Sequence, residues 1–233
     1  MSLFPIFLKL TGRPCIVIGG GEIAASKIDS LLAAEARVTV IAPVASARIV
    51  VMSEAGEVTL HQREYTAGDL AGHFLAVAAT SNPAVNRAVF ADAEAAGILI
   101  NAVDDPPFCD FYFPSVVRRG DLQIAISTAG ASPALAQRLR KEIDALLPLD
   151  AGEWLAELGN LRREILQREP ANEARRELLH QLASRDLCGF EGCPTRALAR
   201  RHAQINPLRT NPPSAAENDD SHSAIKSTIE RKP

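Results

Sequence analysis

The chain has 233 residues, of which 47% are hydrophobic, and its formal net charge is −3. This length allows one large domain or two small ones with a real core, and the balanced charge gives no overall reason to expect a nucleic-acid partner. The four cysteines are irregularly spaced, which favours reduced thiols in a cytoplasmic protein over a disulfide framework. No apolar run reaches the roughly 20 residues of a membrane helix, so no membrane partner is expected. The first ten residues, MSLFPIFLKL, lack the pattern of a signal peptide, and we expect their apolar side chains to pack on the sheet.

The first hundred residues alternate between strand and helix patterns. Short apolar or β-branched runs predict strands at 15–18, 38–42, 58–60, 74–79 and 98–103. Helical spacing predicts a helix over 22–34, and a second helix begins after Asn82-Pro83 and ends at Gly97. This alternation predicts an α/β fold, a Rossmann-like parallel sheet with helices on both faces.

The pattern changes after Asp104. Runs at 111–118 and 122–127 flank RRGD and predict a β-hairpin, and Ser132-Pro133 opens a helix that ends at Pro148. Asp150 is a candidate cap for a further amphipathic helix, and another follows over 172–184. We therefore expect four segments: a nucleotide-binding domain over 1–112, the hairpin and helix over 113–149, a small helical domain over 150–205, and a polar, disordered tail over 206–233.

A glycine-rich turn follows the first predicted strand. Gly19-Gly20-Gly21-Glu22-Ile23-Ala24 fits G-x-G-x-x-A, in which Gly19 makes the tight turn and Gly21 lets a pyrophosphate approach the backbone. The N-terminus of the helix that starts at Glu22 would supply N–H groups to the phosphates. Because a strand precedes the motif and a helix follows it, the sequence predicts a dinucleotide site. The alternative is a glycine-rich turn without a ligand.

The second strand lacks the acidic residue that usually binds the ribose of the dinucleotide. It ends in Ile41-Ala42-Pro43-Val44, so the adenosine end would be held by backbone groups or by Glu22. No arginine stands at this strand end to bind a 2′-phosphate, although Arg48 is near in the sequence. The pattern therefore favours NAD over NADP.

The segment NAVDDPPFCDFYFPS follows the last strand of the predicted sheet. Ligands of open α/β sheets bind beyond the carboxyl ends of the strands, which would place Asp104 in the crevice beside the nicotinamide. A purely structural alternative is equally open, because Asp104 and Asp105 could simply cap the rigid turn made by Pro106-Pro107.

Several ordered motifs together resemble one known family. They are Phe4–Phe7, the glycine turn, VTVIAP, Ala78–Thr80, Val85-Asn86, N-x-V-D-D-P at 101–106, F-P-S at 113–115 and S-T-x-G-x-S-P-x-L-A at 127–136. Over roughly residues 1–205 the chain resembles precorrin-2 dehydrogenase/sirohydrochlorin ferrochelatase, the N-terminal module of siroheme synthase. The resemblance implies that NAD+ takes a hydride from precorrin-2 to give sirohydrochlorin, and that Fe2+, as a substrate, is then inserted to give siroheme.

The resemblance also implies roles for particular residues. Asp104 matches the catalytic aspartate of both steps, and Glu22-Ile23 and Pro43-Val44 match the NAD contacts of the family. We add Gly19, Gly21 and Thr80 to the expected cofactor contacts. The resemblance also implies a homodimer, in which the hairpin and helix over 111–147 would form much of the interface. Thr128, where some relatives have serine, and Ala102, where valine is commoner, depart from the pattern.

A substrate that carries many carboxylates needs cationic and N–H groups. The candidate substrate-binding residues are Asn101, Ser115, Arg118, Arg119, Thr128, Ser132 and Arg138, with Arg140 and Lys141 also available. For each arginine, a solvated surface charge is the competing interpretation. The macrocycle itself would hold the iron through its nitrogens, so no permanent metal site of the protein is expected. Cys188, Cys193 and His202 lack the paired second half of a zinc site.

Other functions remain open from the sequence. The chain could be a dehydrogenase without chelatase activity, with the metal added by another protein, and cobalt could replace iron. It could also be a non-catalytic NAD-sensing module, or an NAD-dependent oxidoreductase for another substrate. An NAD-sensing module would normally carry the missing acid and would not need the N-x-V-D-D-P segment.

Overall fold

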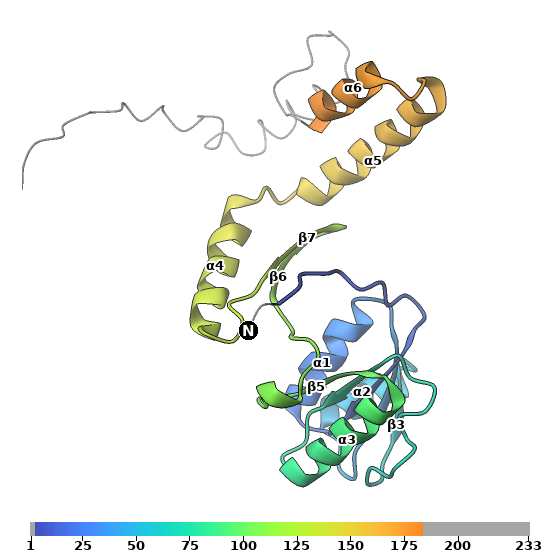
Figure 1. Ribbon diagram of the computed structural model, residues 1–233, viewed down its shortest axis with the longest axis vertical. Helices are drawn as coiled ribbons and strands as arrows, with labels where there is room; N and C mark the ends of the chain where they lie inside the picture. The colour runs from blue at the N-terminus through green and yellow to red at the C-terminus, as the bar shows by residue number, and fades with distance from the viewer. Residues whose placement is uncertain (1–2, 184–233) are drawn as a thin grey trace, which may run out of the picture. The chain divides into compact units, whose positions relative to one another are not determined.

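The computed structural model describes residues 3–183, and these form two compact units. The first unit comprises residues 3–114 and 127–133, and the second comprises 115–126 and 134–183. Figure 1 shows the elements of both units and labels most of them. The predicted tail over 206–233 and the end of the predicted helical domain lie outside the described residues, so the four predicted segment boundaries remain a prediction.

The first unit is built on a parallel sheet of five strands in the order β3-β2-β1-β4-β5. The strands are β1 (Pro14–Ile18), β2 (Arg37–Ile41), β3 (Val58–His61), β4 (Leu75–Ala78) and β5 (Leu99–Ala102). Strand β1 pairs with β2 on one side, where Ile18 lies opposite Ile41, and with β4 on the other, where Ile18 lies opposite Ala78. The strand order therefore changes direction between β1 and β4. This reversal is the point at which open α/β sheets bind ligands. The predicted fold class is confirmed.

Three α-helices accompany the sheet: α1 (Glu22–Leu32), α2 (Ala47–Glu54) and α3 (Pro83–Ala96). The predicted ends of α3 are correct, because the Asn82 side chain accepts a hydrogen bond from the Ala84 N–H and Gly97 adopts the left-handed conformation. Helix α2 was missed by the sequence analysis. It is only eight residues long, and its N-cap residue Ser46 makes no side-chain capping bond, so its local signal is short.

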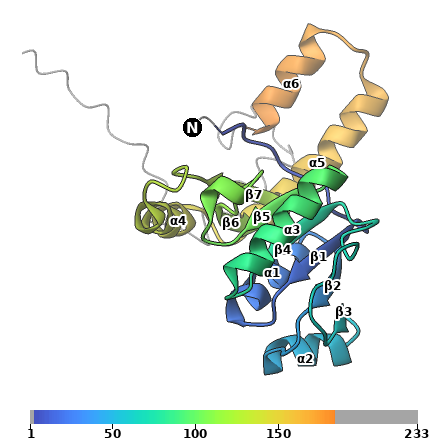
Figure 2. The ribbon, with the colours of Figure 1, turned by 60° about the horizontal axis from the view of Figure 1, so that its bottom comes forward.

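The strands are buried on both faces, and alternate residues supply two separate cores. Cys15, Val17 and Val40 face α1 and α2, whereas Ile16, Ile18 and Ile100 face α3. Figure 2 shows α3 and the α1–α2 layer on opposite sides of the sheet. The sheet is thus fixed between two apolar layers, and its carboxyl edge can carry a site without contributing to the core.

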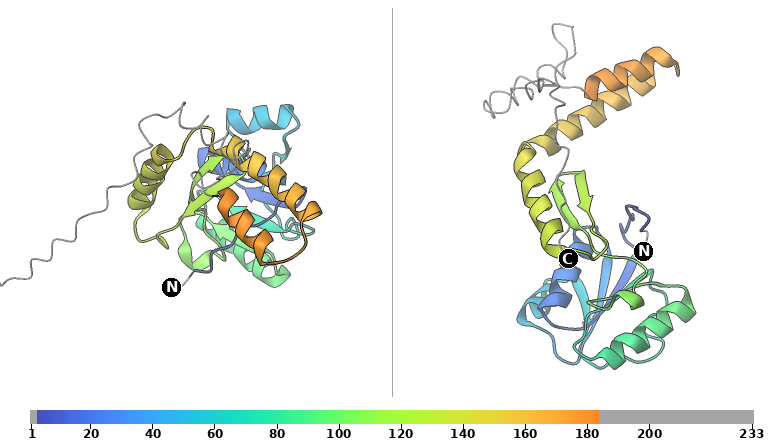
Figure 3. Two further views of the ribbon diagram at one scale, coloured as in Figure 1. Left: turned by 90° about the horizontal axis from the view of Figure 1, so that it is seen from above. Right: turned by 60° about the vertical axis from the view of Figure 1, so that its left-hand side comes forward.

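The second unit contains a hairpin and the helices that follow it. Its elements are β6 (Ser115–Arg119), β7 (Leu122–Ile126), α4 (Pro133–Leu146), α5 (Ala151–Arg168) and α6 (Glu173–Ala183). Helices α5 and α6 contact one another along the chain, as two views in Figure 3 show. The start of α5 crosses the hairpin so closely that a Cβ on Gly152 would lie 2.7 Å from the Arg119 carbonyl oxygen. Asp150 occupies the predicted cap position but makes no side-chain capping bond.

Three expectations from the sequence need correction. Strand β6 begins at Ser115 rather than at residue 111, because Phe111 and Phe113 pack against the core of the first unit instead. Arg118 and Arg119 lie in β6 and pair with Gln123 and Leu122, so only the two residues Gly120 and Asp121 make the turn. Of the apolar side chains near the N-terminus, Leu10 packs in the core, but Phe4, Ile6, Phe7 and Leu8 do not.

That N-terminal segment is solvent-exposed for most of its length. Phe4 is 85% exposed and Phe7 70% exposed, and only Leu10 reaches the core. No helix within residues 3–183 is long and apolar enough to cross a membrane.

Candidate functional site

A cavity of about 900 Å³ lies at the carboxyl edge of the sheet in the first unit. A volume of this size is typical of small-molecule and cofactor sites. The structure places every predicted cofactor contact, and Asp104, in the wall of this cavity: Gly19, Gly21, Glu22, Ile23, Pro43, Val44, Thr80 and Asp104. The sequence positions of these residues span 86 places, and the fold brings them together at one edge, although their roles remain a prediction.

The glycine turn between β1 and α1 leaves no room for side chains at its first two positions. A Cβ on Gly19 would lie 2.3 Å from the Ala79 carbonyl oxygen, and φ there is +134°, which favours glycine. A Cβ on Gly20 would lie 2.0 Å from the Val44 carbonyl oxygen. Gly21 differs, because its Cβ would meet no atom within 4 Å. The turn is therefore packed on the protein side and open on the cavity side.

The open side of the turn fits the pyrophosphate of a dinucleotide. Gly21 is the N-cap of α1, and no side chain caps the helix there. The first N–H groups of an α-helix have no partner within the helix, and the positive end of the helix dipole favours an anion. The glycine turn and the start of α1 could therefore hold the cofactor phosphates as the motif predicts.

Thr80 is fixed by a residue that the sequence analysis did not select as a site residue. The Oγ1 atom of Thr80 donates to Oδ1 of the buried Asn86 at 2.7 Å, and the Asn86 amide donates back to the Thr80 carbonyl at 3.1 Å. Both residues line the cavity. The signal was present as an asparagine on the first turn of α3, where its side chain can reach back to the preceding loop. The pair holds the loop between β4 and α3 in place.

Asp104 follows β5 with a strained backbone. Its φ is +61°, in the left-handed region that is uncommon for residues other than glycine, although aspartate and asparagine enter it most readily. The Val103 N–H donates to the Ala78 carbonyl at 2.9 Å and fixes the chain just before it. Strain of this kind is often found at functional sites. The side chain is exposed at the cavity wall, as the expected position beyond the strand end requires.

Lys27 on α1 lies near Asp104 and was also missed by the sequence analysis. Its side chain is half-buried, and its ammonium lies 4.3 Å from the centre of the Phe113 ring. Burial lowers the pKa of Lys27, and the Asp104 carboxylate opposes this by raising it. A cation therefore lies within electrostatic reach of the candidate base. Helical spacing alone could not show that this lysine faces the end of a strand.

The walls of the cavity are acidic. Within the described residues they contain four carboxylates, from Glu22, Glu64, Asp104 and Asp105, and no lysine, arginine or histidine. Arg48, which is near in the sequence, instead forms an ion pair with Asp29 on α1. This composition agrees with the expected preference for NAD over NADP, because nothing in the wall would neutralise a 2′-phosphate.

The uncharged substrate candidates have structural partners. Asn101 is buried, and its amide donates to the Phe111 carbonyl at 2.8 Å. Thr128 donates to the Ser132 carbonyl at 3.1 Å and accepts from the Ser132 N–H at 3.2 Å, which closes the turn before α4. Ser115 begins β6 opposite Ile126. These contacts give each residue a reason to be present that does not depend on a substrate.

The charged candidates belong to the second unit, and their contacts differ. The Arg119 guanidinium binds the Asp144 carboxylate at 2.7 Å and is only 19% exposed. Arg138 pairs with Glu142 on the exposed side of α4, where the side chain of Arg138 is 74% exposed and that of Glu142 is 50% exposed. Arg118 is exposed in β6, with its guanidinium 3.4 Å from the Gln123 side-chain oxygen. Arg119 is thus occupied inside its own unit, whereas Arg118 and Arg138 face solvent.

The two cysteines in the described part of the chain are reduced. Cys15 is buried in β1, and burial raises the pKa of its thiol to about 11. Cys109 is partly buried, and burial raises the pKa of that thiol as well. Within residues 3–183, no group of three or more histidine, cysteine, aspartate or glutamate side chains is arranged to hold a metal ion. Cys188, Cys193 and His202 lie outside the described residues.

Comparison with known proteins shows which family the chain resembles. A family model described as NAD(P)-binding matches residues 6–115, and the model of the sirohaem biosynthesis protein central region matches residues 119–146. The siroheme synthase of Methylococcus capsulatus is 43% identical over 176 residues, and siroheme synthase 1 of Serratia proteamaculans is 39% identical over 176 residues. The chain is therefore similar to the N-terminal part of siroheme synthases. The resemblance found in the sequence motifs is thereby confirmed.

The extent of the likeness differs between relatives and structures. The alignments to these two siroheme synthases cover 76% of this chain but 37% of each relative, so the chain spans little more than a third of their length. The solved structure of a precorrin-2 dehydrogenase, SirC, is 27% identical with a TM-score of 0.68. That comparison covers 87% of this chain and all of the other.

Proposed function

We propose that the chain is an NAD-dependent precorrin-2 dehydrogenase. The observation that carries this proposal is that Asp104, in a strained conformation, shares one cavity with the glycine turn that fits a dinucleotide. The likeness to a precorrin-2 dehydrogenase supports the substrate. The acidic, lysine- and arginine-free wall supports NAD rather than NADP as the cofactor.

The cofactor supplies the hydride acceptor, and the residues of the chain supply position and a base. Dehydrogenation removes one hydride and one proton from the reduced macrocycle. Asp104 accepts the proton at a carboxylate oxygen, and Lys27 supplies the nearby positive charge. The products are sirohydrochlorin, NADH and a proton. Asp104 releases this proton to water after the reaction.

The second proposed step is insertion of Fe2+ into sirohydrochlorin. Metal insertion releases two pyrrolic N–H protons, so the same carboxylate can serve again as a base. The four ring nitrogens of the macrocycle bind the iron, and Fe2+ is therefore a substrate rather than a resident cofactor. Arg118 and Arg138 are proposed to bind substrate carboxylates, with the homodimer as the active assembly.

Asp104→Asn tests the role of the base without changing the backbone. Asparagine enters the left-handed region about as readily as aspartate, so the strained turn is retained while the base is lost. Purified protein is mixed anaerobically with NAD+ and enzymatically generated precorrin-2, and NADH formation is measured by its absorbance. Fe2+ is then added, and metal insertion is measured from the absorption spectrum of the tetrapyrrole. We expect the rate of NADH formation to fall about 10²- to 10⁴-fold in Asp104→Asn, as for loss of a general base.

Asp121→Asn in the exposed hairpin turn is the matched control, and it should retain the rate of the unaltered chain. If Asp104→Asn also abolishes enzyme-accelerated iron insertion, one carboxylate serves both steps. If it abolishes only NADH formation, the chain is a dehydrogenase and another protein adds the metal. If the unaltered chain binds NAD+ but never forms NADH, the proposed activity is wrong and a sensor role replaces it.

A further inference from the structure

The end of β2 lacks an acidic residue, but an acidic residue follows the adjacent strand, β3. Strand β3 runs beside β2 in register, with Ile41 opposite His61, and the Ala42 N–H donates to the His61 carbonyl at 3.1 Å. Both strands therefore end at the same edge of the sheet. Three residues beyond His61 the chain reaches Glu64, which lines the same cavity as Pro43 and Val44. A carboxylate is thus present at this end of the cavity, but on another strand.

The loop that carries Glu64 is anchored on one side by an arginine–aspartate pair. Both terminal nitrogens of Arg63 bind the Asp69 carboxylate at 2.7 Å, and the Thr66 N–H donates to the same carboxylate at 2.8 Å. The hydrogen bonds from Arg63 hold the pKa of Asp69 down to about 2. Arg63 also donates to the Glu64 backbone carbonyl at 3.0 Å. The backbone of Glu64 is therefore held by a charged cluster that remains ionised across the working pH range.

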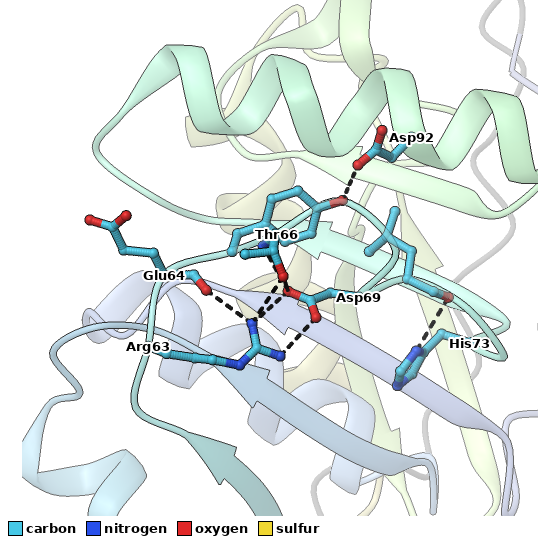
Figure 4. A network of polar contacts seen from close by, with 8 residues as sticks. Arg63, Glu64, Thr66, Asp69, His73 and Asp92 are labelled. Carbon is cyan, nitrogen blue, oxygen red and sulfur yellow. Dashed lines mark hydrogen bonds and ion pairs between the residues drawn. The ribbon is translucent and has the colours of Figure 1, made fainter.

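The other side of the loop is tied to α3. The Tyr65 hydroxyl donates to the Asp92 carboxylate, and burial together with this bond raises the pKa of the tyrosine. Figure 4 shows both anchors, with the Glu64 side chain extending away from Arg63 and Asp69. The Glu64 carboxylate is exposed and takes no part in the cluster that fixes its backbone. A rigid backbone thus presents a charged group at the cavity wall.

We propose that Glu64 is a specificity-determining residue that binds the ribose hydroxyls of the adenosine half of NAD. This inference rests on the proposed function, because it concerns the same cofactor. A carboxylate accepts hydrogen bonds from the 2′- and 3′-hydroxyls, and it repels a 2′-phosphate because both groups are negative. The described cavity wall holds no cation to offset that repulsion. Glu22 is the other acidic candidate, but it is the first residue of α1 and lies at the glycine turn, where the phosphates would bind.

Binding of nucleotides to the purified chain, measured by isothermal titration calorimetry, tests this role without requiring activity. The unaltered chain and Glu64→Gln are compared with NAD+, NADP+ and nicotinamide hypoxanthine dinucleotide, which lacks the adenine amino group. Hydrogen bonds to charged groups contribute enough for roughly a tenfold loss of NAD+ affinity in Glu64→Gln. Affinity for NADP+ should fall less or rise, so the ratio of NAD+ affinity to NADP+ affinity should decrease.

Two further variants separate the carboxylate from its surroundings. Glu57→Gln, an exposed residue at the opposite end of β3, is the matched control and should bind all three nucleotides like the unaltered chain. Tyr65→Phe removes one anchor of the loop and should weaken NAD+ and NADP+ alike, without changing the ratio between them. Thermal unfolding of each variant shows whether a loss of affinity reflects a loss of structure.

Several results would overturn the inference. It is wrong if Glu64→Gln binds NAD+ and NADP+ as the unaltered chain does, or if only Glu22→Gln narrows the preference. It is also wrong if Glu64→Gln loses only the discrimination between NAD+ and the hypoxanthine analogue, because the carboxylate then contacts the adenine rather than the ribose. If the unaltered chain binds none of the three nucleotides, the proposed function fails together with this inference. In the other cases the proposed function stands.

Discussion

The two units of the chain are stabilised by different means. Nearly all of the buried apolar residues in the described part belong to the first unit, where two layers of helices cover a parallel sheet. In the described part of the second unit, the buried apolar residues are Val117, Ala136, Pro148, Ala151 and Leu182. That unit relies instead on the hairpin ladder, the Arg119–Asp144 ion pair and the close crossing at Gly152.

This difference explains what each unit can do alone. The packed sheet can hold strained residues such as Asp104 because the core fixes the strands on which they depend. The second unit leaves apolar residues of its helices at the surface, among them Leu135, Leu146 and Leu166. Exposed apolar side chains on an amphipathic helix are suited to contact with another molecule. They support the expected homodimer, which remains a prediction.

Gly20→Ala should have the largest effect, because it overpacks the first unit at a point surrounded by backbone atoms and by the Cβ of Ala42. The new Cβ would lie 2.0 Å from the Val44 carbonyl oxygen and 3.0 Å from the Ala45 Cα. Neither atom can move without displacing the end of β2, so the free energy of unfolding should fall by about 3 kcal/mol. Urea unfolding followed by circular dichroism measures this loss.

The neighbouring glycine provides the matched control. A Cβ on Gly21 would meet no atom within 4 Å, so Gly21→Ala should leave the free energy of unfolding within about 0.5 kcal/mol of its original value. The same variant should weaken NAD+ binding, because the methyl group enters the space proposed for the pyrophosphate. Equal destabilisation by the two variants would show that the turn is not packed as described.

Gly152→Ala makes the equivalent test in the second unit. The Cβ would lie 2.7 Å from the Arg119 carbonyl oxygen, so we expect a loss of about 1–3 kcal/mol in the stability of that unit. Gly159→Ala in the same helix is the control, because its Cβ would approach only the flexible Arg163 side chain at 3.7 Å. That variant should stabilise the helix by up to about 1 kcal/mol. NAD+ affinity should be unchanged in both, and a loss of NAD+ affinity in Gly152→Ala would contradict the separation of roles.

The sequence predicted the first unit well because its signals are local. Apolar runs, the Asn82 cap and the Gly97 stop each act within a few residues, and the glycine motif fixes its own turn. Helix α2 was missed because eight residues with a β-branched run carry little helical signal. The start of β6 was misplaced because Phe111 and Phe113 are apolar in sequence but pack on the first core rather than in a strand.

The candidate site was predictable only where a motif carries it. Gly19, Gly21 and Asp104 stand at strand ends, and strand ends of a parallel sheet meet at one edge. Lys27, Glu64 and Asn86 were not selected because their place at the cavity depends on which face of a helix, or which loop, the tertiary fold turns toward it. The burial of Asn101 and the Asp144 pair of Arg119 are likewise properties of packing that residue type alone does not indicate.

Comparing Arg119→Met with Arg138→Met distinguishes a structural arginine from a solvated one. Both variants should destabilise the chain less than Gly20→Ala does. The guanidinium donates to the Asp144 carbonyl at 3.2 Å in addition to its ion pair, and it is mostly buried, so its loss should cost about 1–2 kcal/mol of stability. Arg138→Met removes an ion pair on the exposed face of α4 and should cost only a few tenths of a kcal/mol. Unfolding curves compare the two variants. If Arg138→Met instead weakens binding of sirohydrochlorin while Arg119→Met does not, Arg138 serves the substrate and Arg119 serves the fold.

The smallest effect concerns the loop of the first unit that carries Glu64, and it depends on pH. The pKa of Asp69 is lowered from 3.8 to about 2 in the folded chain, chiefly by the hydrogen bonds from Arg63. A lowered pKa means that the ionised group stabilises the fold above about pH 4 and that this contribution is lost as the pH falls from about 4 to 2. Because Arg63 is about half exposed, Asp69→Asn should lower the free energy of unfolding by no more than about 1 kcal/mol at pH 6, and this difference from the unaltered chain should vanish near pH 2.

Asp121→Asn in the exposed hairpin turn of the second unit is the control, and its free energy of unfolding is compared with that of the unaltered chain at the same pH values. A cost for Asp69→Asn that stays constant between pH 6 and 2 would mean that the loop is held by the Tyr65–Asp92 bond rather than by the charged cluster.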